Sequence, residues 1–225
     1  MMFSRRSRVT GSRLKIVSIL TGLLMVGPAF AETRYDLLLK GGHVIDPKNK
    51  LNAVRDVAIA QGKIAEVSSG IPSSKAHKVV DVSGFYVAPG LVDIHVHVYA
   101  GSGLHGSLPV EQNVYPDSHT FRSGVTTVVD AGTSGWRTFP DFKEKIIDRV
   151  RTRVLAMLNI VGRGQAGEAL EQDVADMDSE ATAEMARKHK GFVVGIKTAH
   201  YNGPEWVAVE RAVQAGTLAD IPVMV

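Results

Sequence analysis

Residues 32–88 alternate short apolar runs with turn-forming residues. The runs are rich in Val, Ile, Leu and Tyr and are too short for helices, which is typical of β-strands. Turn signals such as Gly41-Gly42 and Asp46-Pro47 separate them. This pattern predicts a small antiparallel β-sandwich unit, with strands expected at 35–39, 43–45, 54–60, 63–67, 78–82 and 85–88.

The pattern changes at Pro89-Gly90, after which apolar strands alternate with helical segments. Strands separated by helices at this spacing form βαβ units and a parallel sheet. Residues 89–225 are therefore predicted to be the N-terminal part of a (β/α)8 TIM barrel. A complete barrel needs about 250 residues, so we expect the chain to be an N-terminal fragment of a longer protein. The expected strands are 91–98, 125–129, 153–161, 192–198 and 221–225, and the expected helices are 140–150, 178–191 and 204–216.

Several other classes of protein are disfavoured. An open, doubly wound sheet of five strands is the alternative fold for residues 89–225. The chain has no cysteine, which excludes a disulfide scaffold, a thiolate zinc site and a thiol nucleophile. It has no Gly-x-Ser-x-Gly elbow, which argues against a serine hydrolase.

Residues 1–31 have the features of a secretory signal peptide. A basic start leads into the apolar run 16–30, which ends in the small-x-small cleavage pattern Ala29-Phe30-Ala31. We expect export to the periplasm or the exterior and no stable membrane association after cleavage; an uncleaved anchor is the alternative. This segment holds five basic residues and no acidic one, and it accounts for the net charge of +3. The rest of the chain gives no electrostatic reason to expect nucleic-acid binding.

The strongest chemical signal is the sequence Asp93-Ile-His95-Val-His97, at the end of the strand expected at 91–98. Side chains alternate between the two faces of a strand, so His95 and His97 are expected to point to the same side. In a barrel, the C-terminal ends of the strands are where active sites are built. Two imidazoles at that position can bind one metal ion, most commonly Zn²⁺.

Two more residues end strands of the same predicted sheet. Lys197 follows the apolar run 193–196, where desolvation favours a neutral amine, and a neutral amine can react with CO₂ to give a carbamate that bridges two metals. A lysine extending to the barrel rim is the alternative. Asp130 ends the second strand, where it can support the site or cap a turn. His200, after the lysine strand, is a weaker candidate for substrate contact.

The motif Pro89-Gly-Leu-Val-Asp-Ile-His-Val-His97, placed after a β unit and before a barrel lysine, resembles the amidohydrolase superfamily. The segments 121–132, 134–136 and 195–201 resemble its metal-dependent deacetylase branch. The resemblance covers about residues 34–225. It implies that His95 and His97 hold one metal ion, that carboxylated Lys197 bridges a binuclear zinc centre, and that two further histidines and an acid/base aspartate are expected beyond Val225.

One position departs from the dihydroorotase pattern. Dihydroorotases typically carry an Arg two residues after the second histidine, and here that position is Tyr99. Tyrosine lacks the bidentate charged fork of arginine, so dihydroorotase activity is disfavoured, and Tyr99 becomes a candidate substrate contact.

The resemblance therefore implies a hydrolase that cleaves an acyl amide or ester of a small-molecule substrate by a metal-activated hydroxide. The alternatives are a cyclic amidohydrolase or a deaminase on the same scaffold, and a chain that is inactive by itself. A homo-oligomer is left open.

Overall fold

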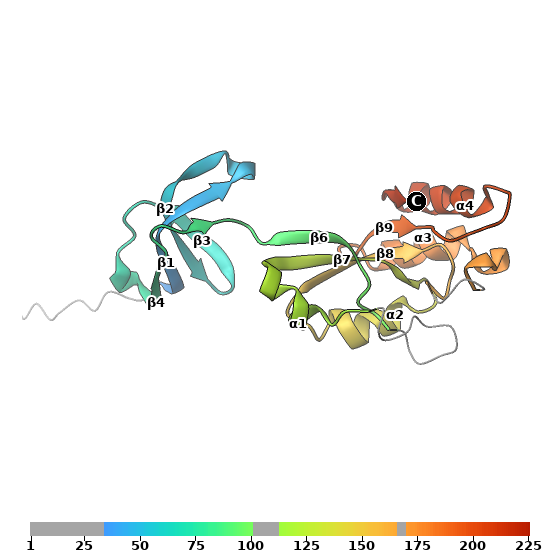
Figure 1. The fold of residues 1–225 in the computed structure, drawn as a ribbon, viewed down its shortest axis with the longest axis horizontal. Helices are drawn as coiled ribbons and strands as arrows, with labels where there is room; N and C mark the ends of the chain where they lie inside the picture. Colours follow the sequence, from blue (N-terminus) through green and yellow to red (C-terminus); the bar gives the residue numbers. More distant parts are fainter. Residues whose placement is uncertain (1–33, 101–112, 166–169) are drawn as a thin grey trace, which may run out of the picture. The chain divides into compact units, whose positions relative to one another are not determined.

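The computed structural model describes residues 34–100, 113–165 and 170–225, so the expected signal peptide at 1–31 lies outside the described residues. The chain divides into two compact units between Val87 and Ala88 (Figure 1). Each unit is described by itself. Within the described ranges, no helix is long and apolar enough to cross a membrane.

The N-terminal unit is a five-stranded sheet in the order β3-β2-β1-β4, in which β5 also pairs with β1. The β1–β2 and β2–β3 pairs are antiparallel, but β4 and β5 both run parallel to β1. The prediction of a wholly antiparallel unit is therefore wrong in this respect, because strand direction depends on long-range pairing. The strands are β1 (Tyr35–Asp46), β2 (Leu51–Ala60), β3 (Lys63–Ser68), β4 (Ala76–Asp81) and β5 (Tyr86–Val87).

The two strands expected at 35–39 and 43–45 are one bent strand, β1. Its register with β2 shifts between Leu39 and Gly42, and Gly41 has a φ of 75°. Gly41-Gly42 is therefore a bulge within a strand and not the expected turn. The buried carboxylate of Asp56 accepts hydrogen bonds from the Gly41 amide at 2.9 Å and from Lys40 Nζ at 3.0 Å, which stabilises the bend.

The C-terminal unit contains a curled five-stranded sheet in the order β10-β9-β8-β7-β6, and every neighbouring pair is parallel. This confirms the predicted βαβ architecture. The order in space follows the order in the chain, so all carboxyl ends lie along one edge. The strands are β6 (Leu91–Val96), β7 (Val125–Gly135), β8 (Arg153–Asn159), β9 (Val193–Lys197) and β10 (Val223–Met224).

The helices of this unit begin and end at recognisable signals. Asp178 caps α3 by accepting hydrogen bonds from the amides of Glu180 and Ala181, both at 3.0 Å. The helix expected at 140–150 consists of a short α-helix followed by a π-helical segment, η5 (Lys143–Ile147). The α-helices are α1 (Pro116–His119), α2 (Phe139–Phe142), α3 (Ser179–Lys188) and α4 (Val207–Ala219).

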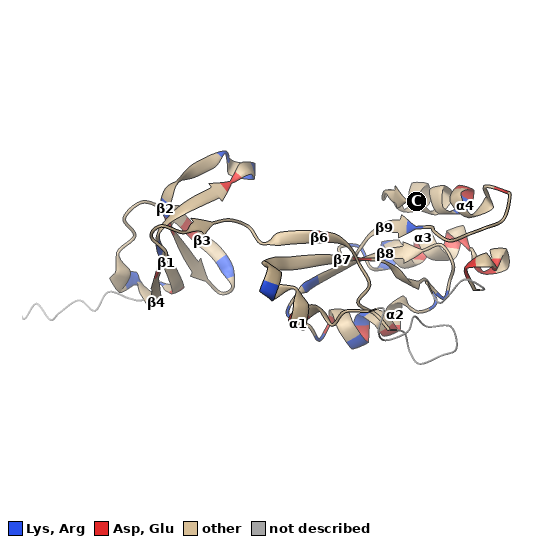
Figure 2. Ribbon diagram, viewed as in Figure 1, with Lys and Arg blue, Asp and Glu red and all other residues tan. Residues whose placement is uncertain are grey.

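The core of this unit lies between the sheet and its helices. Val128, Leu158 and Ile196 from the strands pack with Phe142 of α2 and Ala212 of α4, and each is fully buried. Figure 2 shows acidic and basic residues mainly on the helices and loops, with few on the strands of the parallel sheet. A charged residue at the end of one of these strands therefore needs a specific explanation.

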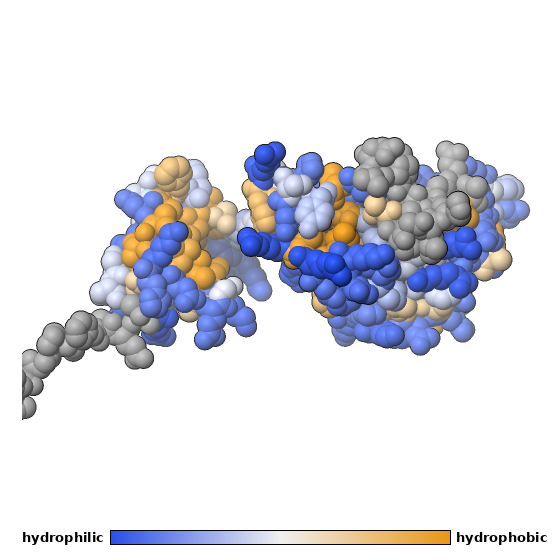
Figure 3. All heavy atoms as spheres, turned by 90° about the horizontal axis from the view of Figure 1, so that it is seen from below, coloured by the Kyte–Doolittle hydropathy of each residue, from blue (hydrophilic) through white to orange (hydrophobic). Residues whose placement is uncertain are grey.

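Apolar side chains also reach the surface of both units (Figure 3). In the C-terminal unit they include Leu91, Val92 and Ile94 of β6, which are 57–61% exposed. Because side chains alternate along a strand, Leu91 lies on one face of β6, and Val92 and Ile94 lie on the other. Both faces of this edge strand are therefore accessible to solvent.

Candidate metal centre

His95 and His97 lie at the carboxyl end of β6. Their ring centroids are 5.8 Å apart and the rings meet edge to face. His95 is exposed and His97 is half-buried. Two imidazoles at this separation, on one side of a strand end, can turn a ring nitrogen toward a shared ion.

Lys197 is the last residue of β9 and pairs with Asn159 of β8 and Met224 of β10. Its side chain is only 8% exposed, and it makes no hydrogen bond or ion pair with any residue in the described ranges. It does interact electrostatically with His97. The fold therefore brings to one sheet edge an amine and two imidazoles that are about a hundred residues apart in sequence.

The electrostatic surroundings of His97 favour a neutral ring. Burial lowers the pKa of His97 below its usual value, and the nearby positive groups of His95, Lys197 and His200 lower it further. A neutral imidazole is the form that binds a metal ion. The residues present thus fit a bound metal, although the described ranges contain no cluster of three His, Cys, Asp or Glu side chains that could hold one.

A carboxylate that the sequence did not point to lies beside this cluster. Glu171, in the 3₁₀ turn η6 (Leu170–Gln172), is 2% exposed. Burial raises the pKa of Glu171, and His200, Asn159 and Lys197 act in the opposite direction. The local pattern around Glu171 carries no strand or helix signal, so only its burial marks it as a candidate.

His200 is the partner of Glu171. Its Nδ1 lies 3.2 Å from both carboxylate oxygens, and its backbone has a φ of 61°, the left-handed conformation that L residues rarely adopt. Such backbone strain is concentrated at functional sites. His200, Tyr201, Glu205 and Trp206 also line a cavity of about 340 Å³. The position of His200 is therefore compatible with the expected substrate contact.

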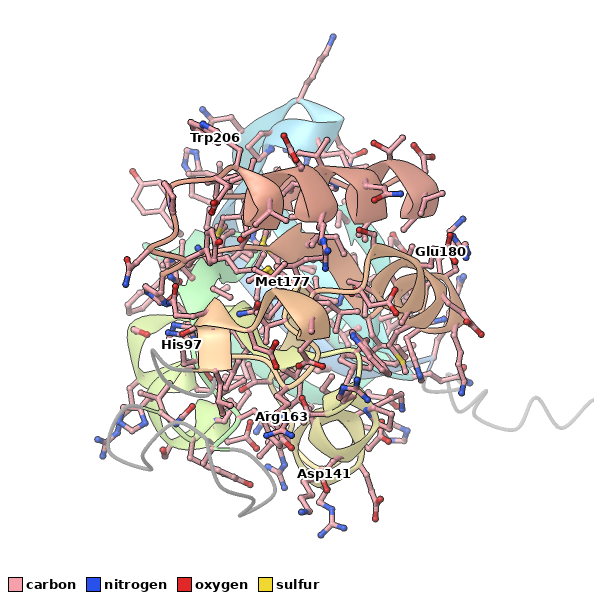
Figure 4. The ribbon with its side chains drawn as sticks, turned by 90° about the vertical axis from the view of Figure 1, so that its right-hand side faces the viewer. His97, Asp141, Arg163, Met177, Glu180 and Trp206 are labelled. Atoms are coloured by element: carbon pink, nitrogen blue, oxygen red, sulfur yellow. The ribbon has the colours of Figure 1, made fainter. Side chains whose placement is uncertain are left out.

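Tyr99 has a different environment from the one expected. Its ring is 2% exposed and stacks on Phe142 of α2 at 5.0 Å, and its hydroxyl donates a 2.6 Å hydrogen bond to Asp141. Figure 4 shows Asp141 on α2, away from His97. This geometry gives Tyr99 a packing role, so it does not support the expected substrate contact.

Asp130 is the completely buried carboxylate of β7. It accepts hydrogen bonds from the backbone amides of Val98 at 2.9 Å and Thr133 at 2.7 Å. The first of these bonds joins β7 to the residue that follows His97. Asp130 therefore caps the turn of its own strand through Thr133 and also bonds to the backbone next to His97, so it has the geometry of both roles expected for it.

No family model matches the chain, but a comparison with curated proteins finds relatives that cover most of it. A deacetylase of Agrobacterium fabrum is 30% identical over 171 residues, which is 73% of this chain and 40% of that protein. The chain thus spans less than half the length of this curated relative.

The comparison with solved structures agrees with the sequence comparison. An adenine deaminase superposes with a TM-score of 0.69 at 30% identity, and a dihydroorotase superposes with a TM-score of 0.68 at 26% identity. Each match covers 84% of this chain and 50% of the solved chain. With the histidine pair and the strand-end lysine in place, the chain belongs to the amidohydrolase superfamily.

Proposed function

We propose that this chain carries the N-terminal part of the active site of a zinc-dependent hydrolase of the deacetylase type. Its substrate would be a small molecule bearing an acetyl or other small acyl group on nitrogen or oxygen. The observation that carries the proposal is the meeting of His95, His97 and buried Lys197 at one edge of the parallel sheet.

His95 and His97 would supply neutral ring nitrogens to a zinc ion. Lys197 would join them as its carbamate, which forms when the neutral amine nitrogen attacks CO₂ and releases a proton. Counting the proton that the ammonium form must lose first, the overall change would release two protons and replace a cation among neighbouring imidazoles with an anion that offers two oxygen ligands. Bound zinc would supply an activated water and polarise the acyl carbonyl.

The residues around this cluster have roles of their own. His200 pairs with Glu171 through Nδ1 and also lines the cavity formed with Tyr201 and Trp206, so its Nε2 would be the nitrogen that contacts a substrate there. The neutral state of His97 keeps its nitrogen ready for the metal without loss of a proton.

Two observations favour a deacetylase over the alternatives. The match to a deacetylase extends over 73% of the chain. The position two residues after His97 is a buried tyrosine, which cannot grip a substrate carboxylate as arginine would. A deaminase or cyclic amidohydrolase is the second candidate, because an adenine deaminase and a dihydroorotase are similar in fold.

The first experiment is elemental analysis of the purified chain beside the variant His95→Ala/His97→Ala. We expect about one or more zinc ions per chain, lost in the variant. The matched control is His77→Ala/His119→Ala, which removes two exposed histidines outside the site and should keep the metal. Absence of zinc from the unmodified chain, or equal zinc in all three proteins, contradicts the proposal.

Substrate class is tested on the zinc-loaded protein with N-acetyl and O-acetyl compounds, beside adenine, dihydroorotate and hydantoin. Release of acetate alone supports a deacetylase. Ammonia release from adenine, or opening of a cyclic amide, supports the second candidate instead.

A further inference from the structure

The cavity that His200 lines adjoins the carboxyl edge of the parallel sheet. Its lining begins at Thr198, the residue that directly follows Lys197. Glu171 bonds to His200 at 3.2 Å and to Asn159 at 3.5 Å, and Asn159 is the β8 neighbour of Lys197. The cavity volume of about 340 Å³ is at the lower end of the range for small-molecule sites. A substrate at the proposed metal centre can therefore extend one of its groups into this cavity.

The loop that forms the cavity is held in place by its own contacts. The side-chain amide of Gln172 donates to the carbonyl of His200 at 2.7 Å, and its oxygen accepts from the backbone N–H of Asn202 at 2.8 Å. Gly203 allows the Tyr201 ring to lie across the backbone, because a Cβ atom at position 203 would be 2.6 Å from Cε1 of that ring. The aromatic wall is therefore formed before any ligand binds, which lowers the cost of binding.

Two aromatic side chains and one carboxylate give the cavity its chemical character. Trp206 is 72% exposed, so its ring is accessible to a ligand. The hydroxyl of Tyr201 donates a 3.2 Å hydrogen bond to Glu205, and no Lys, Arg or His within the described ranges pairs with that carboxylate. None of the described residues that line the cavity is Lys or Arg. Aromatic faces and a carboxylate attract cations, so this lining favours a positively charged ligand.

We propose that this cavity binds a cationic aromatic group of the substrate, of the arylalkylammonium class. The ring of this group would lie against Trp206 and Tyr201, and its ammonium would face Glu205. The inference rests on the proposed function for the identification of the ligand as a substrate. The preference for a cation is a property of the cavity itself and is present without metal.

The test measures the affinity of the purified, metal-free chain for three probes of similar shape, by NMR titration: benzylammonium, benzyl alcohol and benzoate. Absence of metal prevents benzoate from binding at the histidine pair as a ligand of the ion. Benzylammonium is expected to bind about three- to tenfold more tightly than benzyl alcohol, through its attraction to the aromatic rings and the carboxylate. Benzoate is expected to bind most weakly. Equal affinities, tightest binding of benzoate, or no binding of any probe would overturn the inference.

Variants locate the bound probe. Glu205→Gln should remove the preference for benzylammonium and leave the affinity for benzyl alcohol unchanged. The matched control is Glu184→Gln, an exposed residue of α3 outside the cavity, which should keep the preference. Trp206→Ala should weaken both probes by about two- to tenfold, and Trp206→Phe, which retains a ring, should weaken them less. A preference that persists in Glu205→Gln and in Trp206→Ala would place the probe elsewhere and contradict the inference.

The zinc-loaded chain separates this inference from the proposed function. An N-acetylated aromatic amine that carries a second, cationic amine should release acetate faster than an N-acetylated aromatic acid of the same size. Cation preference in a chain that binds no zinc or releases no acetate would support the cavity and contradict the proposed function. Acetate release without cation preference in the metal-free chain would support the proposed function and contradict the inference.

Discussion

Gly132 lies directly against the side chain of Lys197. A Cβ atom at position 132 would be 2.7 Å from Cγ and 2.9 Å from Cβ of the lysine. Gly132 also has a φ of 92°, in the region that side chains disfavour. The lysine at the end of β9 can take its buried position only because β7 carries no side chain at this point.

Replacement of Gly132 by alanine tests this relationship. Backbone strain should cost about 1–2 kcal/mol, and the steric conflict with Lys197 about 1–3 kcal/mol more. Urea unfolding measures the free energy of unfolding. The control is Gly124→Ala, which has a similar φ of 76° and open space around its Cβ, so it should lose only the strain contribution. Equal losses in both variants would show that the contact with Lys197 is relaxed without cost.

Carbamate formation on Lys197 predicts that zinc uptake depends on bicarbonate. In the unmodified chain, added bicarbonate should raise zinc affinity by about tenfold or more, and intact mass spectrometry under native conditions should detect the mass of one CO₂. Lys197→Met should lose both effects, whereas Lys190→Met, on the surface, should keep them. Bicarbonate dependence that persists in Lys197→Met would place the reaction at another amine.

The raised pKa of Asp130 predicts how the free energy of unfolding changes with pH. Its pKa is about 6 in the folded chain and near 3.8 when exposed, so the folded state holds more protons between these values. Stability from this group is therefore greatest at low pH and falls as pH rises from about 4 to about 6. The loss is about 3 kcal/mol.

The comparison that isolates this contribution is Asp130→Asn, measured by urea unfolding across that pH range. The difference in unfolding free energy between the unmodified chain and the variant should change by about 3 kcal/mol with pH. A difference that stays constant from pH 4 to pH 7 would mean that Asp130 titrates normally.

Substitution of Tyr99 tests whether this residue packs in the core or contacts the substrate. Tyr99→Phe keeps the stacking on Phe142 and removes the hydrogen bond to Asp141, so it should cost about 1 kcal/mol of stability. Zinc affinity and KM for acyl substrates should be unchanged. The matched variant is Asp141→Ala, which removes the same hydrogen bond from the other side and should have a similar effect on stability. A KM that rises in Tyr99→Phe but not in Asp141→Ala would show that Tyr99 contacts the substrate.

Much of the architecture is readable from local sequence. The alternation of strands and helices after Pro89 predicts the parallel sheet, because apolar periodicity is a property of neighbouring residues. The same period of two predicts that His95 and His97 share a side of their strand. The caps also act locally, as Asp178 does at the start of α3.

Other features depend on contacts between distant residues. Thr133 meets His97 across 36 positions, and Glu171 meets His200 across 29. No periodicity relates such pairs, because their meeting depends on strand register and on the path of each loop. The parallel pairing of β1 with β4 is of the same kind.

The sequence by itself therefore determined the order of the elements, the histidine pair and the placement of Lys197 at a strand end. The tertiary structure decided which side chains surround these residues. Tyr99 is buried in the core, Asp130 bonds to the amide that follows His97, and Thr133 bonds to the His97 ring. The absence of a side chain at Gly132 leaves space for Lys197. The physical reason is that local propensities select elements, whereas burial and hydrogen bonding between elements select the neighbours of each functional group.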